Sequence, residues 1–174
     1  MKYKLSSSTW GKEEIKAINS VIENDMYSMG EKVSLYEKDF ASYFNSKYAV
    51  MTSSGSTANL IATAALFYTK KNKLKRGDEV IVPAVSWSTT YFPLHQYGLK
   101  LKFVDIDLNT LNYDLEALKS AISEKTKLIM AVNLLGNPND FSVINNLIKN
   151  KDIILIEDNC ESMGAQFDKK QAGT

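Results

Sequence analysis

Three short polar segments carry the residue types that a phosphorylated aromatic molecule would need. The first is Thr52–Asn59, a run of small hydroxyl residues that we expect to open a helix. Gly55 lets the backbone approach an anion, and Ser56 and Thr57 offer hydroxyl and amide donors at the positive end of the helix dipole. The run is neither a Walker loop nor a dinucleotide fingerprint. Ser and Thr are also ordinary helix caps, so a phosphate cradle and a plain cap both stay open.

The second segment, Pro83–Thr90, places a tryptophan among small hydroxyl residues. An indole such as that of Trp87 stacks well on a flat heteroaromatic ring. A tryptophan in a core or in a subunit interface is the competing interpretation. The segment therefore indicates a ring-binding role for Trp87 only in combination with the other two.

The third segment, Glu157–Ser162, brings carboxylates to the place where an apolar run ends. Asp158 is suited to pair with a pyridinium nitrogen, and a carboxylate there keeps the nitrogen protonated so that the ring acts as an electron sink. A helix N-cap and a magnesium ligand are the alternatives. Taken together, a phosphate cradle, a stacking indole and a carboxylate for a ring nitrogen predict one cofactor, pyridoxal 5'-phosphate.

These segments need a scaffold that brings them to one edge, and the pattern of apolar residues predicts it. Short runs rich in Val and Ile predict strands at Tyr48–Met51, Val80–Val82, Leu101–Val104, Leu128–Val132 and Ile153–Ile156. The stretches long enough for crossover helices are Thr57–Tyr68, Thr89–Tyr97, Asp114–Ile122 and Phe141–Ile148. This alternation predicts an α/β fold, a mainly parallel sheet with helices on both faces, whose ligands bind beyond the carboxyl ends of the strands.

Two helices are expected ahead of the sheet. Apolar residues recur at helical spacing in Glu13–Ile22, behind Ser8 and Thr9 as candidate caps. A second apolar stripe follows Gly30, and we expect both stripes to contact the core. We therefore divide the chain into an N-terminal segment, residues 1–30, which contributes to the active site or an interface, and residues 31–174, the first part of a large cofactor-binding domain.

Composition limits the classes of function. The 174 residues are 44% apolar, enough for one globular domain, and 21 Lys and Arg against 20 Asp and Glu give a net charge of +1, which gives little support to nucleic-acid binding. The start, Met1–Leu5, lacks an apolar run and no stretch is long enough for a membrane span, so we expect a cytoplasmic protein without membrane contact. One cysteine, Cys160, and one histidine, His95, predict neither a disulfide nor a metal site of the Cys/His kind.

The same segments resemble the sugar-aminotransferase branch of the type I pyridoxal-phosphate enzymes, which have the aspartate-aminotransferase fold. The motifs that carry the resemblance run through nearly the whole chain and are Ser54–Asn59, Gly77–Pro83, Phe103–Asp107, Glu157–Ala165 and Ala172–Thr174. The resemblance implies the large domain of that fold, incomplete in this chain. It also implies that Gly55, Ser56 and Thr57 surround the cofactor phosphate, that Trp87 stacks on the ring and that Asp158 meets the ring nitrogen.

Departures from the usual motifs of this branch indicate a subgroup. The variant segments are Ser7–Trp10, Ser86–Thr90, Val132–Pro138 and Glu157–Glu161. They look like those of members that expel the 3-hydroxyl of a 4-keto-6-deoxy nucleotide-sugar. By resemblance, such an enzyme uses pyridoxamine 5'-phosphate, releases the 3-deoxy sugar and ammonia, and takes its amine from L-glutamate. A nucleotide-sugar aminotransferase and a non-catalytic binding fragment are the alternatives.

The residue that separates these alternatives is expected beyond Thr174. In the dehydratases of this branch a histidine replaces the Schiff-base lysine, and a histidine acts as acid or base but cannot hold the cofactor covalently. His95 falls in a helical pattern and is expected on a helix surface or in packing. We therefore predict that the 174-residue chain is part of a longer protein and is inactive alone.

Several further residues are expected near the site. We expect Glu161 and Ser162 to be more distant cofactor contacts. We expect Asn133 to contact the phenolic oxygen of the ring, with Asn137 competing for that role. The candidates for the sugar pocket are Trp10, Tyr27 and Ser88. The aromatic N-terminal segment would serve equally well at a subunit interface. Family members are generally homodimers, so a homodimer is expected here.

Overall fold

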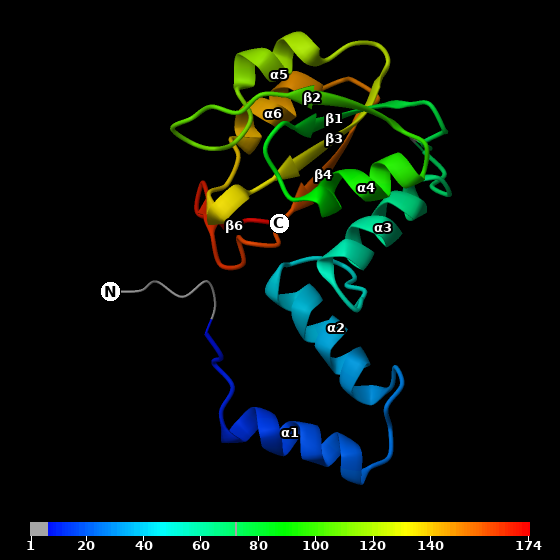
Figure 1. Cartoon of the computed structure of the whole chain (residues 1–174), viewed down its shortest axis with the longest axis vertical. Helices are drawn as coiled ribbons and strands as arrows, with labels where there is room; N and C mark the ends of the chain where they lie inside the picture. Colours follow the sequence, from blue (N-terminus) through cyan, green and yellow to red (C-terminus); the bar gives the residue numbers. More distant parts are fainter. Residues whose placement is uncertain (1–6, 72) are drawn as a thin grey trace.

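The sheet of the computed structural model has four parallel strands in the order β2-β1-β3-β4 (Figure 1). The structure describes residues 7–71 and 73–174, so the argument about Met1–Leu5 lies outside the described residues. The strands are β1 (Glu79–Pro83), β2 (Lys100–Val104), β3 (Thr126–Val132) and β4 (Ile154–Asp158), followed by the short antiparallel pair β5 (Gln166–Phe167) and β6 (Lys170–Gln171). Four of the five predicted strands are confirmed, with ends shifted by one or two residues.

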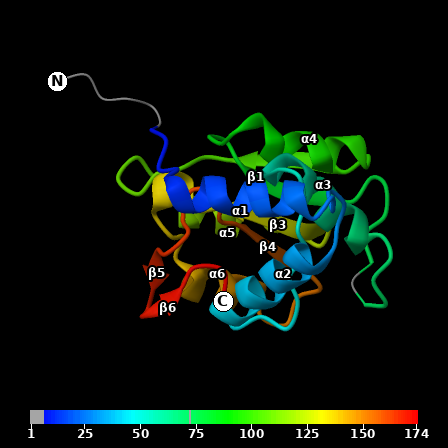
Figure 2. The same ribbon diagram turned by 90° about the horizontal axis from the view of Figure 1, so that it is seen from below.

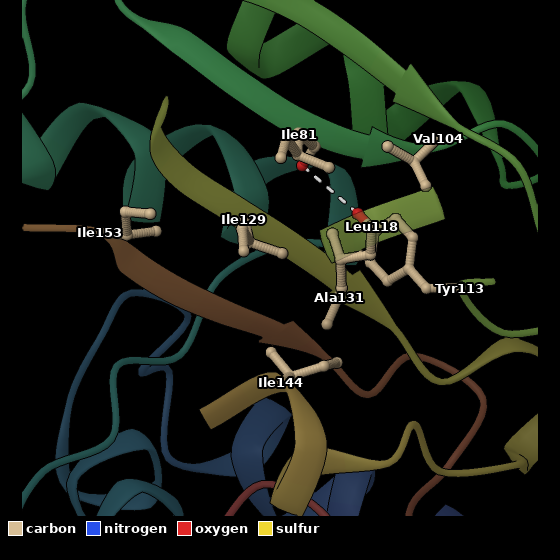
Figure 3. Close-up of a cluster of buried hydrophobic side chains, with 8 residues drawn as sticks. All are labelled: Ile81, Val104, Tyr113, Leu118, Ile129, Ala131, Ile144 and Ile153. Carbon is tan, nitrogen blue, oxygen red and sulfur yellow. Dashed lines mark hydrogen bonds between the residues drawn. The ribbon is translucent and has the colours of Figure 1, made fainter. Parts of the chain in front are cut away.

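Alternating side chains give the sheet two apolar faces. Ile81 and Ile129 point to one face, where helices α5 and α6 pack (Figure 3). Their neighbours Val80 and Leu128 point to the other face, against α3 and α4. The covering helices are α3 (Gly55–Leu66), α4 (Ser88–Gln96), α5 (Leu115–Ala121) and α6 (Phe141–Ile148). Since strands buried on both sides read as continuous apolar runs, the expected parallel sheet with helices on both faces is confirmed.

Polar side chains begin three of these helices. Ser54 caps α3 by accepting a hydrogen bond from the backbone N–H of Thr57 at 3.2 Å. Asp114 caps α5 and Asp140 caps α6 in the same way. Each cap satisfies an N–H group that the helix itself cannot, and it fixes the point at which a loop becomes a helix.

A buried tyrosine joins two central strands beneath α5. The hydroxyl of Tyr113 donates to the carbonyl of Met130 at 2.7 Å, and it lies 3.3 Å from the carbonyl of Ile81 (Figure 3). Burial, with a smaller contribution from the charge of Tyr91, raises the pKa of Tyr113 well above its ordinary value, so the hydroxyl remains a neutral donor. The tyrosine thereby fixes β1 and β3 to one another near the end of the sheet that carries the site.

The predicted strand at Tyr48–Met51 is wrong. The segment has no strand assignment, and the side chains of Tyr48 and Val50 are 76% and 70% exposed. The backbone N–H of Met51 donates to Oε1 of Glu37 on α2 at 2.8 Å, and the carbonyl of Tyr48 accepts from Oγ of Ser46 at 3.2 Å. A strand exists only through a hydrogen-bonded neighbour, and the described part of the chain gives this segment none.

Helices α1 (Lys12–Glu23) and α2 (Glu31–Tyr43) confirm the two predicted N-terminal helices, but not the predicted caps of α1 or the expected core contacts of its stripe. Gly11, not Ser8 or Thr9, is the N-cap of α1, and its N–H donates to Oε2 of Glu14 at 2.6 Å. The cap moves because a carboxylate three residues into the helix satisfies the backbone N–H of the cap residue.

The apolar stripe of α1 does not reach the core as expected. None of its residues is buried, and Ile15 and Ile22 are about half exposed. On α2 only Ala41 is buried. Helix α1 stands away from the sheet and its covering helices (Figures 1 and 2), so the described residues provide no surface for its stripe, whereas the carboxyl end of α2 lies near the start of α3. None of the described helices has the length and apolar character needed to cross a bilayer.

Candidate functional site

A cavity of about 470 Å³ opens at the carboxyl ends of the strands, where the loops after β1, β3 and β4 meet the start of α3. Its volume lies within the range of roughly 300–1,000 Å³ that is typical of small-molecule sites. The lining residues are Gly55, Ser56, Asn59, Val85, Ser86, Trp87, Thr89, Thr90, Val132, Leu134, Leu135, Asp158, Cys160 and Glu161. The structure therefore brings five of the expected site residues together: Gly55, Ser56, Trp87, Asp158 and Glu161.

The first turn of α3 leaves its opening N–H groups available to the cavity. Ser54 accepts from Thr57, and the carbonyl of Ser54 accepts from the N–H of Ala58 at 2.9 Å. The hydrogen bonds of residues 7–71 and 73–174 include no acceptor for the N–H of Gly55 or Ser56. A Cβ built on Gly55 would meet only Sγ of Cys160, at 4.0 Å, so the glycine leaves open space above a positive helix end.

Thr57 does not line the cavity, although it was expected beside the phosphate. Its hydroxyl donates to the carbonyl of Ser54 at 2.8 Å and lies 3.0 Å from the N–H of the same residue. The hydroxyl of Thr57 is thus engaged in hydrogen bonds of the capping box with Ser54. Of the two interpretations left open by the sequence, Ser54 and Thr57 form the cap, whereas Gly55 and Ser56 face the cavity.

The carboxylate of Asp158 is held by one donor on each oxygen. Nδ2 of Asn59 donates to Oδ2 at 2.9 Å, and the N–H of Cys160 donates to Oδ1 at 3.1 Å. In the described residues no helix begins after Asp158, so the N-cap alternative is wrong. Within the described part of the chain no group of three or more His, Cys, Asp or Glu side chains is placed to hold a metal ion.

Asn59 is the site residue that the sequence argument missed. It lies on α3, lines the cavity, and its amide reaches both Asp158 and the carbonyl of Thr89, the latter at 3.4 Å. The available signal was its spacing: a residue four positions after Gly55 lies on the same face of a helix. An amide on that face is well placed to bond a carboxylate arriving from a neighbouring strand.

Two of the lining residues, Trp87 and Leu135, are exposed apolar side chains that form the rim of the cavity. Trp87 is 76% exposed at the N-cap position of α4, with no side-chain capping bond, so its indole is available to a ring. Leu135, 72% exposed, has φ +53, a left-handed conformation that is costly for a branched residue. Oε2 of Glu161 accepts from the N–H of Leu135 at 2.6 Å and so stabilises that turn. The carboxylate of Glu161 therefore shapes the rim, while its proposed contact with a cofactor stays a prediction.

The remaining expected residues lie outside the cavity lining. Asn133 is fully buried, with its amide turned into the protein, and Nδ2 of Asn137 donates to the carbonyl of Thr110 at 2.8 Å. Ser88, on α4, is exposed but is not a lining residue. Trp10 and Tyr27 are exposed on the N-terminal segment, which stands apart from the sheet. The described residues thus do not bring the expected sugar contacts to the cavity.

The cavity is suited to a planar ring with an anion at one end and a protonated nitrogen at the other. Backbone donors at the start of α3 suit the anion, the exposed indole of Trp87 suits the ring, and Asp158 suits the nitrogen. Burial and then the charges of Asp158 and Glu161 raise the pKa of the Cys160 thiol. The thiol is therefore protonated near neutral pH and is not an activated nucleophile.

The sequence of the chain is similar to proteins of known family. The DegT/DnrJ/EryC1/StrS aminotransferase family matches residues 8–174. The chain is 67% identical over 172 residues to the GDP-4-keto-6-deoxy-D-mannose 3-dehydratase of Yersinia pseudotuberculosis, covering 99% of this chain and 44% of that protein. The chain thus spans less than half the length of this relative.

Two solved structures are similar to the whole fold. One is the Escherichia coli GDP-4-keto-6-deoxy-D-mannose-3-dehydratase with bound hydrated PLP, at TM-score 0.96 and 65% identity over 99% of this chain and 44% of that chain. The other is a GDP-4-keto-6-deoxymannose-3-dehydratase with a trapped PLP-glutamate geminal diamine, also at TM-score 0.96 and 65% identity, over 99% and 45%. The fold is therefore that of these enzymes over the aligned part.

Because Cys160 is the chain's single cysteine, its reactivity is a clean measure of the field inside the cavity. We expect the pH midpoint for alkylation by iodoacetamide to lie higher in the folded protein than in urea, since burial and two carboxylates disfavour the thiolate. Asp158→Asn should lower the midpoint part of the way and speed alkylation about two- to fivefold near about pH 8, because one charge is removed while burial remains. Mass spectrometry gives the rates. Equal midpoints in the folded and unfolded protein would contradict a raised pKa of the Cys160 thiol.

Proposed function

Because the chain belongs to the DegT/DnrJ/EryC1/StrS aminotransferase family, we propose that its cavity binds pyridoxal phosphate and that the complete protein removes the 3-hydroxyl of GDP-4-keto-6-deoxy-D-mannose. The observation that carries the proposal is the Asp158 carboxylate, held by Asn59 and Cys160 in a cavity that also contains Trp87. The identity to the Yersinia dehydratase supports the substrate. The product would be a 3-deoxy sugar of the colitose type.

The chain's own groups would hold the cofactor at three points. The N–H groups of Gly55 and Ser56 would donate to the phosphate, and the helix dipole of α3 would favour its charge. The indole of Trp87 would cover one face of the ring. Asp158 would accept a hydrogen bond from the ring nitrogen and keep its proton in place.

Asp158 controls the chemistry that the bound group supplies. Pyridoxal phosphate provides an electron sink for a bond that breaks next to its attached nitrogen. The two donors on Asp158 hold the carboxylate in one orientation before a ligand arrives, so that it would be ready to accept from a ring nitrogen. The apolar rim at Trp87 and Leu135 would limit the access of water once the cavity is filled.

L-Glutamate is proposed as the amine donor, and a histidine beyond Thr174 as the acid or base of the reaction. The related structure with a trapped PLP-glutamate adduct supports the first point. The second follows from the motif variants Val132–Pro138 and Glu157–Glu161 and stays a prediction, as does the cytoplasmic location. A lysine at that place would make the protein an aminotransferase.

Cofactor binding is testable through Cys160, which lines the same cavity. Pyridoxal phosphate should protect the thiol from alkylation, with the protection saturating as the cofactor concentration rises. Trp87→Ala should weaken the protection about tenfold, because the stacking surface is lost. Tyr68→Ala is the control, since this exposed aromatic residue lies outside the lining. Unprotected Cys160, or equal effects of the two variants, would count against the proposed site.

The reaction is testable in the complete gene product supplied with pyridoxal phosphate, L-glutamate and GDP-4-keto-6-deoxy-D-mannose. We expect release of ammonia together with a 3-deoxy sugar nucleotide, and a loss of about a hundredfold in kcat for Asp158→Asn because the ring nitrogen loses its carboxylate. Mass spectrometry of the sugar nucleotide distinguishes the two enzyme classes. A 4-amino sugar formed without ammonia would show an aminotransferase.

The exposed N-terminal helices support a homodimer. The apolar stripe of α1 has no buried residue in the described protomer, and the aromatic residues Trp10, Tyr27, Tyr36 and Tyr43 are at least half exposed. A second copy would cover them, and Trp10 and Tyr27 would then serve the interface or the sugar pocket. We expect sedimentation equilibrium to give a dimer, and Ile15→Asp with Ile22→Asp on α1 to weaken it at least about tenfold, since charges would enter an apolar contact. A wild-type monomer would exclude this arrangement.

A further inference from the structure

Asn133 makes four hydrogen bonds inside the protein, and none of them faces the cavity. Its Nδ2 donates to Oε1 of Glu157 and to Oδ1 of Asn159, both at 2.8 Å. Its Oδ1 accepts from the N–H of Asn139 at 2.9 Å and from Nδ2 of the same residue at 3.0 Å. The side chain is fully buried, so every donor and acceptor position of the amide is occupied by protein.

The two residues that accept from Asn133 are the neighbours of Asp158 on either side. Side chains alternate along an extended chain, so Glu157 and Asn159 project to one face of β4 while Asp158 projects to the other, into the cavity. The backbone N–H of Asn133 also donates to the carbonyl of Asp158, at 3.1 Å. The side chain of Asn133 therefore bonds residues 157 and 159 from the face opposite the ligand, while its backbone bonds residue 158 along the sheet.

We infer that Asn133 is a positioning residue for the Asp158 carboxylate, an inference that rests on the proposed cofactor function. A side-chain amide that holds both neighbours fixes the peptide planes on each side of Asp158 and hence the direction in which its carboxylate leaves the strand. Asn59 and the N–H of Cys160 then fix the oxygens from the cavity side. The carboxylate is thus positioned from both faces of the sheet.

The same network ties this position to the last turn of the chain. Oε1 of Glu157 also accepts from the N–H of Gly173 at 2.9 Å, and Oδ1 of Asn159 accepts from Oγ of buried Ser162 at 2.6 Å. Gly173 has φ +88, and a Cβ there would lie 3.0 Å from Nδ2 of Asn159, so glycine is required for this close approach. Movement of Asn133 would therefore reach both Asp158 and residues 172–174.

The test is a double-mutant cycle in the complete gene product, read by titration of pyridoxal phosphate and by the pH dependence of its bound absorbance. Asn133→Ala should weaken binding about tenfold and displace the absorbance titration in the same direction as Asp158→Asn. The double variant should bind pyridoxal phosphate at least about fivefold more tightly than the sum of the two single effects predicts. The reason is that both substitutions disrupt the same positioned carboxylate. Asn159→Ala, which removes one of the two contacts, replaces Asn133→Ala if that variant does not fold.

Asn112→Ala is the matched control. Asn112 is also buried, and its Nδ2 donates to the carbonyls of Asn137 and Pro138, away from Asp158. We expect it to lower stability while leaving cofactor affinity within about twofold and additive with Asp158→Asn. Additive effects of Asn133→Ala and Asp158→Asn would overturn the positioning role while the cofactor site stands. A wild-type protein that does not bind pyridoxal phosphate would overturn the cofactor site and the positioning role together.

Discussion

The register of β4 against β3 is the constraint on which the site depends. Val132 pairs with Asp158 and Ala131 with Glu157, so that Asp158 points into the cavity and Glu157 away from it. A slip of one residue would exchange the two faces, placing Glu157 beneath α3 and Asp158 in the Asn133 network. Because both residues are acidic, charge alone would not distinguish the two registers. The apolar side chains of the strands and the geometry of Asn133 do so.

Two kinds of interaction share the work of fixing that register. Alternating apolar side chains of β3 and β4 pack into the two cores on either face of the sheet. Their burial contributes a large, non-directional stabilisation. At the strand ends, beyond the apolar cores, directional hydrogen bonds from Asn133 and Asn59 hold residues 157–159 in place. A buried polar group that is fully bonded specifies one arrangement, because any alternative would leave donors unpaired in a dry interior. The site thus lies at the change from apolar packing to hydrogen bonding.

The sequence predicted the parts of the fold that depend on local pattern. Apolar runs located β1 to β4, because burial on both faces of a strand requires apolar residues throughout it. Helical spacing located α1 and α2, and the lengths of the stretches between the strands located α3 to α6. Tyr48–Met51 has the same composition but no paired strand, and pairing is a property of the neighbours and not of the run. Trp87 and Asp158 were predictable from their places after strands, and Gly55 from the small polar run at the start of α3, whereas the roles of Asn133 and Asn59 were not. The sequence does not show whether an asparagine side chain contacts a ligand or belongs to an internal hydrogen-bond network.

The two sides of the cavity are built differently, and this bears on how a related enzyme changes its reaction. The Asp158 side is anchored by buried amides, so a substitution there alters the orientation of the carboxylate and with it any chemistry that needs a protonated ring nitrogen. The rim at Trp87 and Leu135 is largely exposed and rests on single contacts such as the one from Glu161. Substitutions on the rim would change which ligand is admitted at little cost to the fold. Substitutions that alter ligand choice are therefore expected at the rim. The hydrogen-bond network behind Asp158 fixes the carboxylate, and every ligand of the cavity must present a group that can pair with it.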